Sequence, residues 1–213
     1  MLPIVDYELD TVSECKPFGF GLTLFCYGCN MHCKMCEGYD YERVTNKCNI
    51  IGNALDILKS KVNPLHEVVV FLGGEMLIHG EELYNALEWC HNQGLKTKIF
   101  TNGMLPDRVK YINEHGLCDS WSVDYKGIQP KDCKEELGII GTKYFDNLLA
   151  TVYDIITHKL PLEIRTTFYS ANEKEEEGIT RYMQNMVQVL RRNYGYEQIN
   201  YIVQHDFRQF IQQ

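Results

Sequence analysis

The chain has 213 residues, of which 45% are hydrophobic and 23% are charged, and these values favour one domain with a buried core. No apolar run approaches the length that spans a bilayer, and residues 1–8 lack the basic-then-apolar order of a signal peptide. We therefore expect a cytoplasmic protein without membrane contact. The net charge of −8 argues against nucleic-acid binding, which uses a basic surface. Nine cysteines in such a chain favour metal or redox chemistry over a disulfide framework.

Short apolar runs alternate along the chain with runs of helical period. Strands are predicted at residues 22–26, 68–72, 97–100, 120–124, 162–169 and 199–203. Helices are predicted at residues 51–62, 81–93, 106–115, 145–156 and 179–190.

This alternation predicts an α/β fold of about six β/α units. The sheet should be parallel, with right-handed crossovers and with the helices outside. Six units are fewer than the eight of a closed barrel, so we expect a curved, open partial TIM barrel. We assign a single domain to residues 1–213, with its core at about 18–205. Ligands bind such sheets at the C-terminal ends of the strands.

Three cysteines follow the first predicted strand with the spacing C-x3-C-x2-C, namely Cys29, Cys33 and Cys36. Three thiolates so close can hold three irons of a cubane [4Fe-4S] cluster and leave the fourth iron without a protein ligand. Cys26 lies three residues earlier, so the paired C-x2-C spacings could also mimic a zinc site. Its position at the end of an apolar strand favours a buried core thiol instead.

Polar residues also mark the ends of the later strands. They are Gly73, Gly74 and Glu75 after the second strand, Thr101 and Asn102 after the third, Asp124 and Lys126 after the fourth, and Arg165 within the fifth. Each alone has an ordinary explanation as a turn residue or an ion-pair partner, but their placement at successive strands behind the cysteines indicates a common site. Period two also puts Glu163, Arg165 and Thr167 on one face of the fifth strand, which suggests a polar barrel interior.

Together these segments resemble the radical S-adenosylmethionine (SAM) enzymes. The chain looks most like the small activating enzymes that install a glycyl radical in a partner protein. Among these, it is similar to the activating proteins of anaerobic ribonucleoside-triphosphate reductase. The matching segments are residues 27–36, 73–75, 100–103, 123–127 and 162–167, in the family's order.

The resemblance implies a role for each residue. Cys29, Cys33 and Cys36 would ligate three irons, and the methionine amine and carboxylate of SAM would chelate the fourth. The other residues would bind SAM: Gly73, Gly74 and Glu75 at its amino group, Thr101 and Asn102 nearby, Asp124 and Lys126 at its ribose or carboxylate end, Arg165 at its carboxylate, and His205 near the end of the last strand.

The resemblance also implies the reaction. The reduced cluster donates one electron to the sulfonium of SAM, the C–S bond breaks, and the resulting 5′-deoxyadenosyl radical abstracts a hydrogen atom from a glycine Cα of the partner reductase. An open barrel leaves a side gap through which the partner's loop could enter. A flavodoxin- or ferredoxin-type protein would supply the electron.

Two positions depart from the family pattern. Met76 follows Gly-Gly-Glu where proline is usual, and Met35 precedes the last cysteine where an aromatic residue is common. Neither change removes a ligand. His79 and His115 have no metal-ligand spacing, so we expect them at the surface.

Two other hypotheses stay open. One is a radical SAM enzyme that acts on a small molecule, such as a deazapurine or a nucleotide. The other is a nonenzymatic zinc or Fe–S binding module.

Overall fold

The computed structural model describes residues 1–33, 36, 39–127, 130–168 and 173–205, without the side chains of residues 39–41, 173, 175 and 205. The described strands form one sheet in the order β3-β1-β2-β4-β5-β6-β7-β8. They are β1 (Pro3–Thr11), β2 (Gly21–Cys26), β3 (Gly52–Asn53), β4 (Val68–Gly73), β5 (Lys96–Thr101), β6 (Ser120–Asp124), β7 (Leu162–Phe168) and β8 (Ile199–His205). The α-helices are α1 (Tyr39–Thr45), α2 (Ala54–Lys61), α3 (Glu81–Asn92), α4 (Pro106–Glu114), α5 (Cys133–Leu137), α6 (Gly141–Thr157) and α7 (Glu173–Tyr194).

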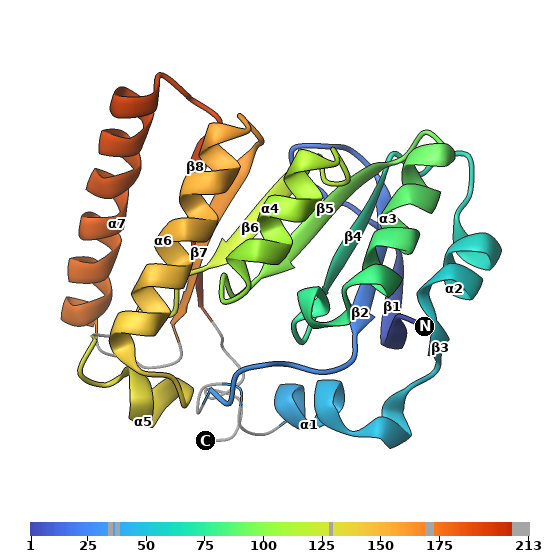
Figure 1. Ribbon diagram of the computed structural model, residues 1–213, viewed down its shortest axis with the longest axis horizontal. Helices are drawn as coiled ribbons and strands as arrows, with labels where there is room; N and C mark the ends of the chain where they lie inside the picture. Colours follow the sequence, from blue (N-terminus) through green and yellow to red (C-terminus); the bar gives the residue numbers. More distant parts are fainter. Residues whose placement is uncertain (34–35, 37–38, 128–129, 169–172, 206–213) are drawn as a thin grey trace.

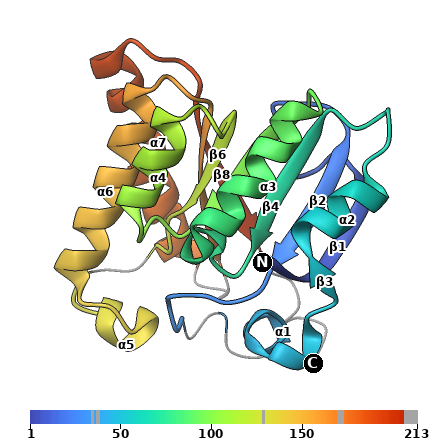
Figure 2. The ribbon, with the colours of Figure 1, turned by 45° about the vertical axis from the view of Figure 1, so that its right-hand side comes forward.

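The six predicted strands are all present and run parallel, from β2 through β4 to β8. Their order in the sheet follows the chain, as successive β/α crossovers of one hand require. Figures 1 and 2 show a curved, open sheet with α3, α4 and α6 on one face and with α2 and α7 toward its two ends. The predicted α/β partial barrel is confirmed.

The sheet also has an antiparallel edge that the search for apolar runs missed. β1 pairs with β2 from Ile4, opposite Cys26, to Thr11, opposite Gly21. β3 has two residues and pairs with the start of β1. β1 is only partly buried and mixes apolar with acidic residues, so it lacks the continuous apolar run of a strand buried on both faces.

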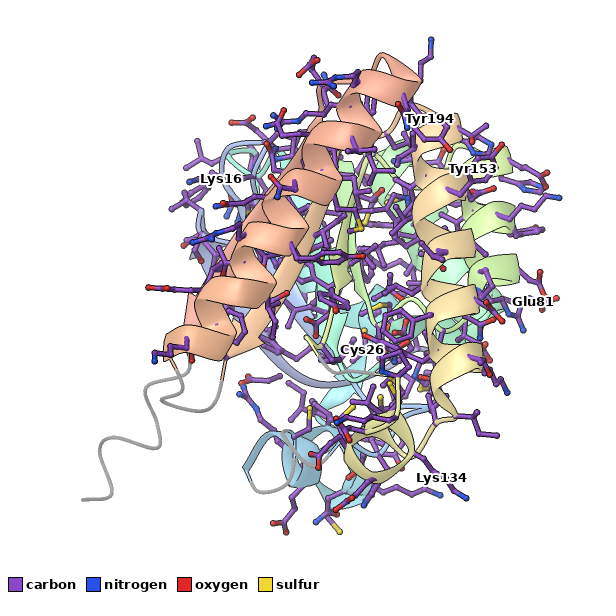
Figure 3. All side chains as sticks on the ribbon, turned by 90° about the vertical axis from the view of Figure 1, so that its left-hand side faces the viewer. Lys16, Cys26, Glu81, Lys134, Tyr153 and Tyr194 are labelled. Atoms are coloured by element: carbon purple, nitrogen blue, oxygen red, sulfur yellow. The ribbon has the colours of Figure 1, made fainter. Side chains whose placement is uncertain are left out.

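Three apolar side chains lie outside the helix faces to which their period assigned them. Ile51 precedes α2, which Asn53 caps, and is 55% exposed. Leu149 of α6 and Tyr182 of α7 are also exposed. Leu149 and Tyr182 line an apolar groove of about 940 Å³ between α6 and α7, on the side of the molecule that faces the viewer in Figure 3. The helical periodicity therefore predicted these two helices correctly, but it assigned too many residues to the helix face that packs on the sheet.

The helix-covered face of the sheet carries the main hydrophobic core. Trp121 of β6 is fully buried, and its indole Nε1 donates a hydrogen bond to Asn113 Oδ1 at 2.8 Å. Cys90 of α3 is buried in the same core, as its place on an apolar helix face predicted. None of the helices in the described ranges combines the length and the apolar content needed to cross a membrane.

The concave face carries charged side chains, as the period-two pattern of β7 predicted. Lys98 of β5 is fully buried, and its Nζ donates hydrogen bonds to Glu163 Oε2 at 2.7 Å and to the Lys16 carbonyl oxygen at 2.6 Å. Arg165 Nη2 lies 3.2 Å from Glu163 Oε2, and Arg165 Nη1 lies 2.6 Å from Glu14 Oε2. Because Glu14 and Lys16 belong to the connection between β1 and β2, this network fixes that connection inside the barrel.

Replacing Lys98 by methionine should test this network. Burial lowers the pKa of Lys98, and the Glu163 carboxylate opposes that shift, so the ammonium depends on its partner. Lys98→Met leaves a buried carboxylate short of one partner, and we expect a loss of about 3 kcal/mol in the free energy of unfolding. Urea titration under reducing conditions measures it.

The matched control is Lys96→Met on the same strand. Lys96 pairs with Asp119 at 2.8 Å, but its side chain is 56% exposed, so the loss should stay below about 1 kcal/mol. Equal losses in the two variants would show that the buried network does not stabilise the barrel.

Candidate functional site

Two adjacent glycines hold the cysteine loop against the end of β4. Gly73 has a φ of 117°, and Gly74 has no space for a side chain, because a Cβ there would lie 1.8 Å from the Gly28 carbonyl oxygen. The Glu75 amide donates to that oxygen at 2.7 Å, and the Gly74 amide donates to the Cys26 carbonyl oxygen at 3.0 Å. The Gly-Gly pair therefore positions the start of the loop that carries the three cysteines.

Further contacts fix the first residues of this loop. The Tyr27 amide donates to the Pro3 carbonyl oxygen at 3.0 Å, which ties the loop to β1. His79 Nε2 lies 2.6 Å from the Tyr27 carbonyl oxygen. His79 is only partly exposed, whereas His115 is exposed at the surface as expected.

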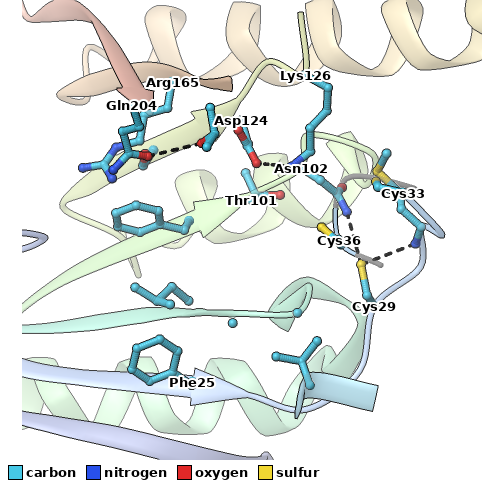
Figure 4. Close-up of a pocket in the computed structure, with 18 of the residues that line it drawn as sticks. Phe25, Cys29, Cys33, Cys36, Thr101, Asn102, Asp124, Lys126, Arg165 and Gln204 are labelled. Atoms are coloured by element: carbon cyan, nitrogen blue, oxygen red, sulfur yellow. Dashed lines mark hydrogen bonds and ion pairs between the residues drawn. The ribbon is translucent and has the colours of Figure 1, made fainter. Parts of the chain in front are cut away.

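Cys29, Cys33 and Cys36 line one cavity of about 300 Å³. Figure 4 shows the three thiols on the same side of it. The other lining residues are Phe25, Met31, Arg43, Val44, Leu72, Gly73, Gly74, Phe100, Thr101, Asn102, Ser122, Asp124, Lys126, Arg165, Thr167 and Gln204. Cys26 is fully buried in the hydrophobic core and does not line the cavity, as a core thiol should be placed.

The thiols form a soft donor set around a shared space. Burial raises the pKa of the Cys29 thiol, and a hydrogen bond to Cys36 together with burial raises that of Cys33. Across the described residues, no three Cys, His, Asp or Glu side chains converge on a point that could hold one metal ion. Three thiols that border a cavity suit a cluster, whose irons are spread over several positions, so these residues fit an iron–sulfur cluster.

Glu75 lies beneath the cavity and does not line it. Its carboxylate is fully buried and accepts hydrogen bonds from Thr101 Oγ1 at 3.0 Å, from the Asn102 amide at 2.7 Å and from the Leu77 amide at 3.3 Å. Burial raises the pKa of Glu75 to about 7, although these hydrogen bonds oppose the shift. The carboxylate thus fixes the turn after β5.

Asn102 joins that turn to the cysteine loop. Its Nδ2 donates to Asn30 Oδ1 at 2.8 Å and lies 3.9 Å from Cys29 Sγ. The Met31 amide donates to the same sulfur atom at 3.4 Å. Hydrogen-bond donors at the sulfur atoms of cluster ligands are one of the means by which a protein sets a cluster's potential.

Charged side chains also line the cavity. Asp124 and Lys126 form an ion pair at the end of β6, and the Lys126 amide donates to Tyr144 Oη at 3.0 Å. The Arg165 guanidinium carbon lies 4.5 Å from the centroid of the Phe100 ring. In Figure 4 Arg165 lies across the cavity from the thiols, whereas Lys126 extends toward Asn102 and the cysteines.

Ten of the twelve predicted site residues line the cavity, and Glu75 is bonded to two of them, Thr101 and Asn102, without lining it. His205 ends β8, and its side chain lies outside the described part of the chain. Sequence reasoning missed Gln204, which extending the period-two pattern along β8 could have found. It also missed Arg43 of α1, which pairs with Asp6 of β1 and has no sequence signal of its own.

The comparisons with known proteins agree with this geometry. The model of the radical SAM superfamily matches residues 23–182, which is more than half of the chain. The chain belongs to the radical SAM superfamily. Members of this superfamily use a [4Fe-4S] cluster and SAM, and these are therefore the cofactors of this chain.

A curated protein of Methanocaldococcus jannaschii, provisionally named as a glycyl-radical enzyme activating enzyme, is 24% identical to this radical SAM chain over 162 residues. The match covers 72% of this chain and 63% of that protein, so the chain spans less than two thirds of the relative's length.

Solved structures share the fold. The structure of anSMEcpe with bound AdoMet (S-adenosylmethionine) has a TM-score of 0.56 and 14% identity, and covers 83% of this chain and 47% of that one. The structure of anSMEcpe with AdoMet and the Kp18Cys peptide has a TM-score of 0.55 and 14% identity, and the match covers 83% of this chain and 48% of that one. At this identity the likeness is one of fold alone.

Glu75 should give this radical SAM protein a specific pH dependence. Because burial favours the neutral carboxyl group, the folded protein binds this proton more tightly than the unfolded chain does between the ordinary pKa of 4.5 and the raised value of about 7. The free energy of unfolding should therefore fall as the pH rises through this window, by an amount on the order of 3 kcal/mol.

Glu75→Gln should remove this part of the pH dependence and keep an acceptor for the turn. The measurement is urea unfolding of the cluster-free protein at pH 5 and pH 8 under anaerobic, reducing conditions. If the free energy of unfolding changes equally between pH 5 and pH 8 in wild type and in Glu75→Gln, the raised pKa of Glu75 is contradicted. Glu81→Gln, at the exposed start of α3, serves as the control for loss of one carboxylate.

Proposed function

We propose that this chain is an activating enzyme that generates the glycyl radical of an anaerobic ribonucleoside-triphosphate reductase. The observation that carries the proposal is the size and position of the cysteine-lined cavity. It holds about 300 Å³ and extends from Phe25 on β2 to Gln204 on β8, the strand at the end of the described sheet. A site at an open edge of the sheet is accessible to a macromolecule.

The cavity volume favours this proposal over the small-molecule alternative. Pockets for one small ligand occupy about 300–1,000 Å³, so this cavity is at the lower limit of that range. The cluster and one SAM would fill it. Among the described residues that line the cavity, little space would then remain for a second small substrate, whereas a glycine on a partner loop could reach the cavity from outside.

Cys29, Cys33 and Cys36 would hold three irons of the cluster as thiolates. Since burial raises the thiol pKa of Cys29, loading the cluster should release protons from this loop. Asn102 and the Met31 amide would keep their positions at Cys29 Sγ and so stabilise charge on that ligand. With Cys26 in the core, the described residues around the cavity offer no fourth thiol, and one iron would remain for SAM.

Backbone carbonyl groups of Gly73 and Gly74 would accept hydrogen bonds from the amino group of SAM, since both residues line the cavity beside the thiols. In this arrangement Glu75 supports the site through the Thr101–Asn102 turn. Lys126 and Arg165 would supply cationic groups for the carboxylate of SAM, and Asp124 would supply an acceptor for ribose hydroxyl groups. His205 as a further SAM contact stays a prediction.

When bound, the reduced cluster would supply the one electron that cleaves the C5′–S bond of SAM, giving methionine and the 5′-deoxyadenosyl group that accepts a hydrogen atom from a glycine Cα of the partner. The residues of this chain would hold the ribose in place for that transfer, whose products are 5′-deoxyadenosine and a glycyl radical. The apolar residues Phe25, Leu72 and Phe100, which line the cavity, would help to exclude water from the reacting groups.

Two comparisons support the choice of a protein substrate. The M. jannaschii relative carries the name of an activating enzyme, and the anSMEcpe fold accommodates a peptide together with AdoMet. The electron would come from a flavodoxin- or ferredoxin-type donor that docks outside the cavity.

Loss of one cysteine of the loop should abolish SAM cleavage. In Cys33→Ala the cluster loses one of three protein ligands, and we expect the yield of 5′-deoxyadenosine to fall at least 100-fold after anaerobic reconstitution with iron and sulfide and reduction with dithionite. Cys48→Ala is the matched control, because Cys48 is an exposed thiol that does not line the cavity. Equal yields of 5′-deoxyadenosine in the two variants would show that the cysteine loop is not needed for SAM cleavage.

The substrate can be tested by isotope transfer. Anaerobic reductase whose glycines carry deuterium at Cα should transfer one deuterium into 5′-deoxyadenosine, and a glycyl-radical doublet should appear in the EPR spectrum of the reductase. Mass spectrometry of 5′-deoxyadenosine measures the transfer. SAM cleavage without deuterium transfer would favour a small-molecule substrate instead.

A further inference from the structure

The two edges of the described sheet differ in how they are protected. At one edge, β1 shows two register shifts, Asp10 has a φ of 60°, and the two-residue β3 covers its start. Asp6 and Glu8 add charge to that edge. Bulges, charges and short edge strands are the usual means by which proteins prevent further strand pairing.

At its start, Arg191 of α7 donates hydrogen bonds to the outward Ile199 carbonyl oxygen at 2.9 Å and 2.5 Å, but from Tyr201 onward β8 has none of these protections in the described residues. It pairs with β7 in continuous register, from Leu162 opposite Ile199 to Phe168 opposite His205, without a bulge. Residues 199–204 contain neither proline nor a charged side chain. In the part of the chain that the structure describes, β7 is the only strand paired with β8. An edge of this kind can accept another strand.

The register identifies the backbone groups that face this edge. The Leu162 amide donates to the Gln198 carbonyl oxygen at 2.9 Å, so Gln198 directs its carbonyl toward β7. Because hydrogen bonding alternates along a parallel strand, Ile202 and Gln204 also face β7. The amide and carbonyl groups of Tyr201 and Val203 therefore point to the open edge.

This edge borders the proposed site. Gln204 lines the cavity that holds the three cysteines, and its Oε1 accepts a hydrogen bond from Thr167 Oγ1 at 3.5 Å. Figure 4 shows Gln204 at the side of the cavity away from the thiols. A strand added to β8 would thus run past the cavity.

We propose that an extended segment of the glycyl-radical partner binds as an additional strand along β8, through the outward amide and carbonyl groups of Tyr201 and Val203, and so brings its glycine to the cavity. This inference rests on the proposed function. A glycine has no side chain to recognise, so a partner segment centred on one must be read through its main chain, which strand addition does.

Val203→Pro tests this pairing. Proline removes the outward N–H and is tolerated where that group faces away from the neighbouring strand, so β7–β8 pairing should persist. With the anaerobic reductase as partner, we expect KM for glycyl-radical formation to rise at least tenfold. Dithionite-driven SAM cleavage without the reductase should stay within twofold of wild type, and Val203→Ala, which keeps the N–H, should keep the wild-type KM.

Amide hydrogen exchange gives a second readout that needs no variant. In the free protein the amides of Tyr201 and Val203 should exchange much faster than those of Ile202 and Gln204, which are bonded to β7. Addition of the reductase should slow exchange at Tyr201 and Val203 at least tenfold. Protection of both amides in the free protein would mean that residues 206–213 or a second copy of the chain covers the edge, and would overturn the inference.

The outcomes separate the two proposals. If wild type forms the glycyl radical and Val203→Pro does so with unchanged KM, strand addition is wrong and the activating role stands. If wild type cleaves SAM but forms no glycyl radical, the activating role itself fails and the inference falls with it.

Discussion

The close approach of two backbones, at Gly28 and Gly74, fixes the site on which the chemistry depends. A Cβ at Gly74 would lie 1.8 Å from the Gly28 carbonyl oxygen, so the cysteine loop reaches the end of β4 only because that position has no side chain. The Glu75 amide completes the contact at 2.7 Å. The buried Glu75 carboxylate accepts a hydrogen bond from the Asn102 amide, and the Asn102 side chain in turn contacts Cys29 Sγ. These contacts therefore link the thiols, the turn after β5 and the end of β4.

A network of charged side chains on the concave face of the sheet lies next to this site and holds Arg165 in place. Lys98, Glu163 and Arg165 lie on the concave face of neighbouring strands, and Glu14 brings the β1–β2 connection into the same network. Buried charges at this density are costly to desolvate, and here two of them hold the guanidinium of Arg165, which lines the cavity. The barrel interior thus combines a fixed polar floor with a cavity that has room for one organic ligand.

The sequence was sufficient for the six parallel strands and for most of the site, because buried parallel strands read as apolar runs and their C-terminal ends share one edge of the sheet. It was insufficient for β1, whose mixed apolar and acidic residues give no such run. It could not place Glu75, since a carboxylate can point into a cavity or beneath it with the same neighbours in the chain. Likewise, the exposure of Leu149 depends on the spacing of α6 and α7, which periodicity does not report.

The central claim is that three cysteines hold a [4Fe-4S] cluster with one iron free for SAM. Electron–nuclear double resonance on the dithionite-reduced, reconstituted protein with SAM labelled by ¹⁵N at its amino group tests it most directly. The account predicts a hyperfine coupling between the cluster and the labelled nitrogen, which is lost when unlabelled SAM replaces it. A reduced [4Fe-4S] cluster that shows no coupling to the label would contradict it.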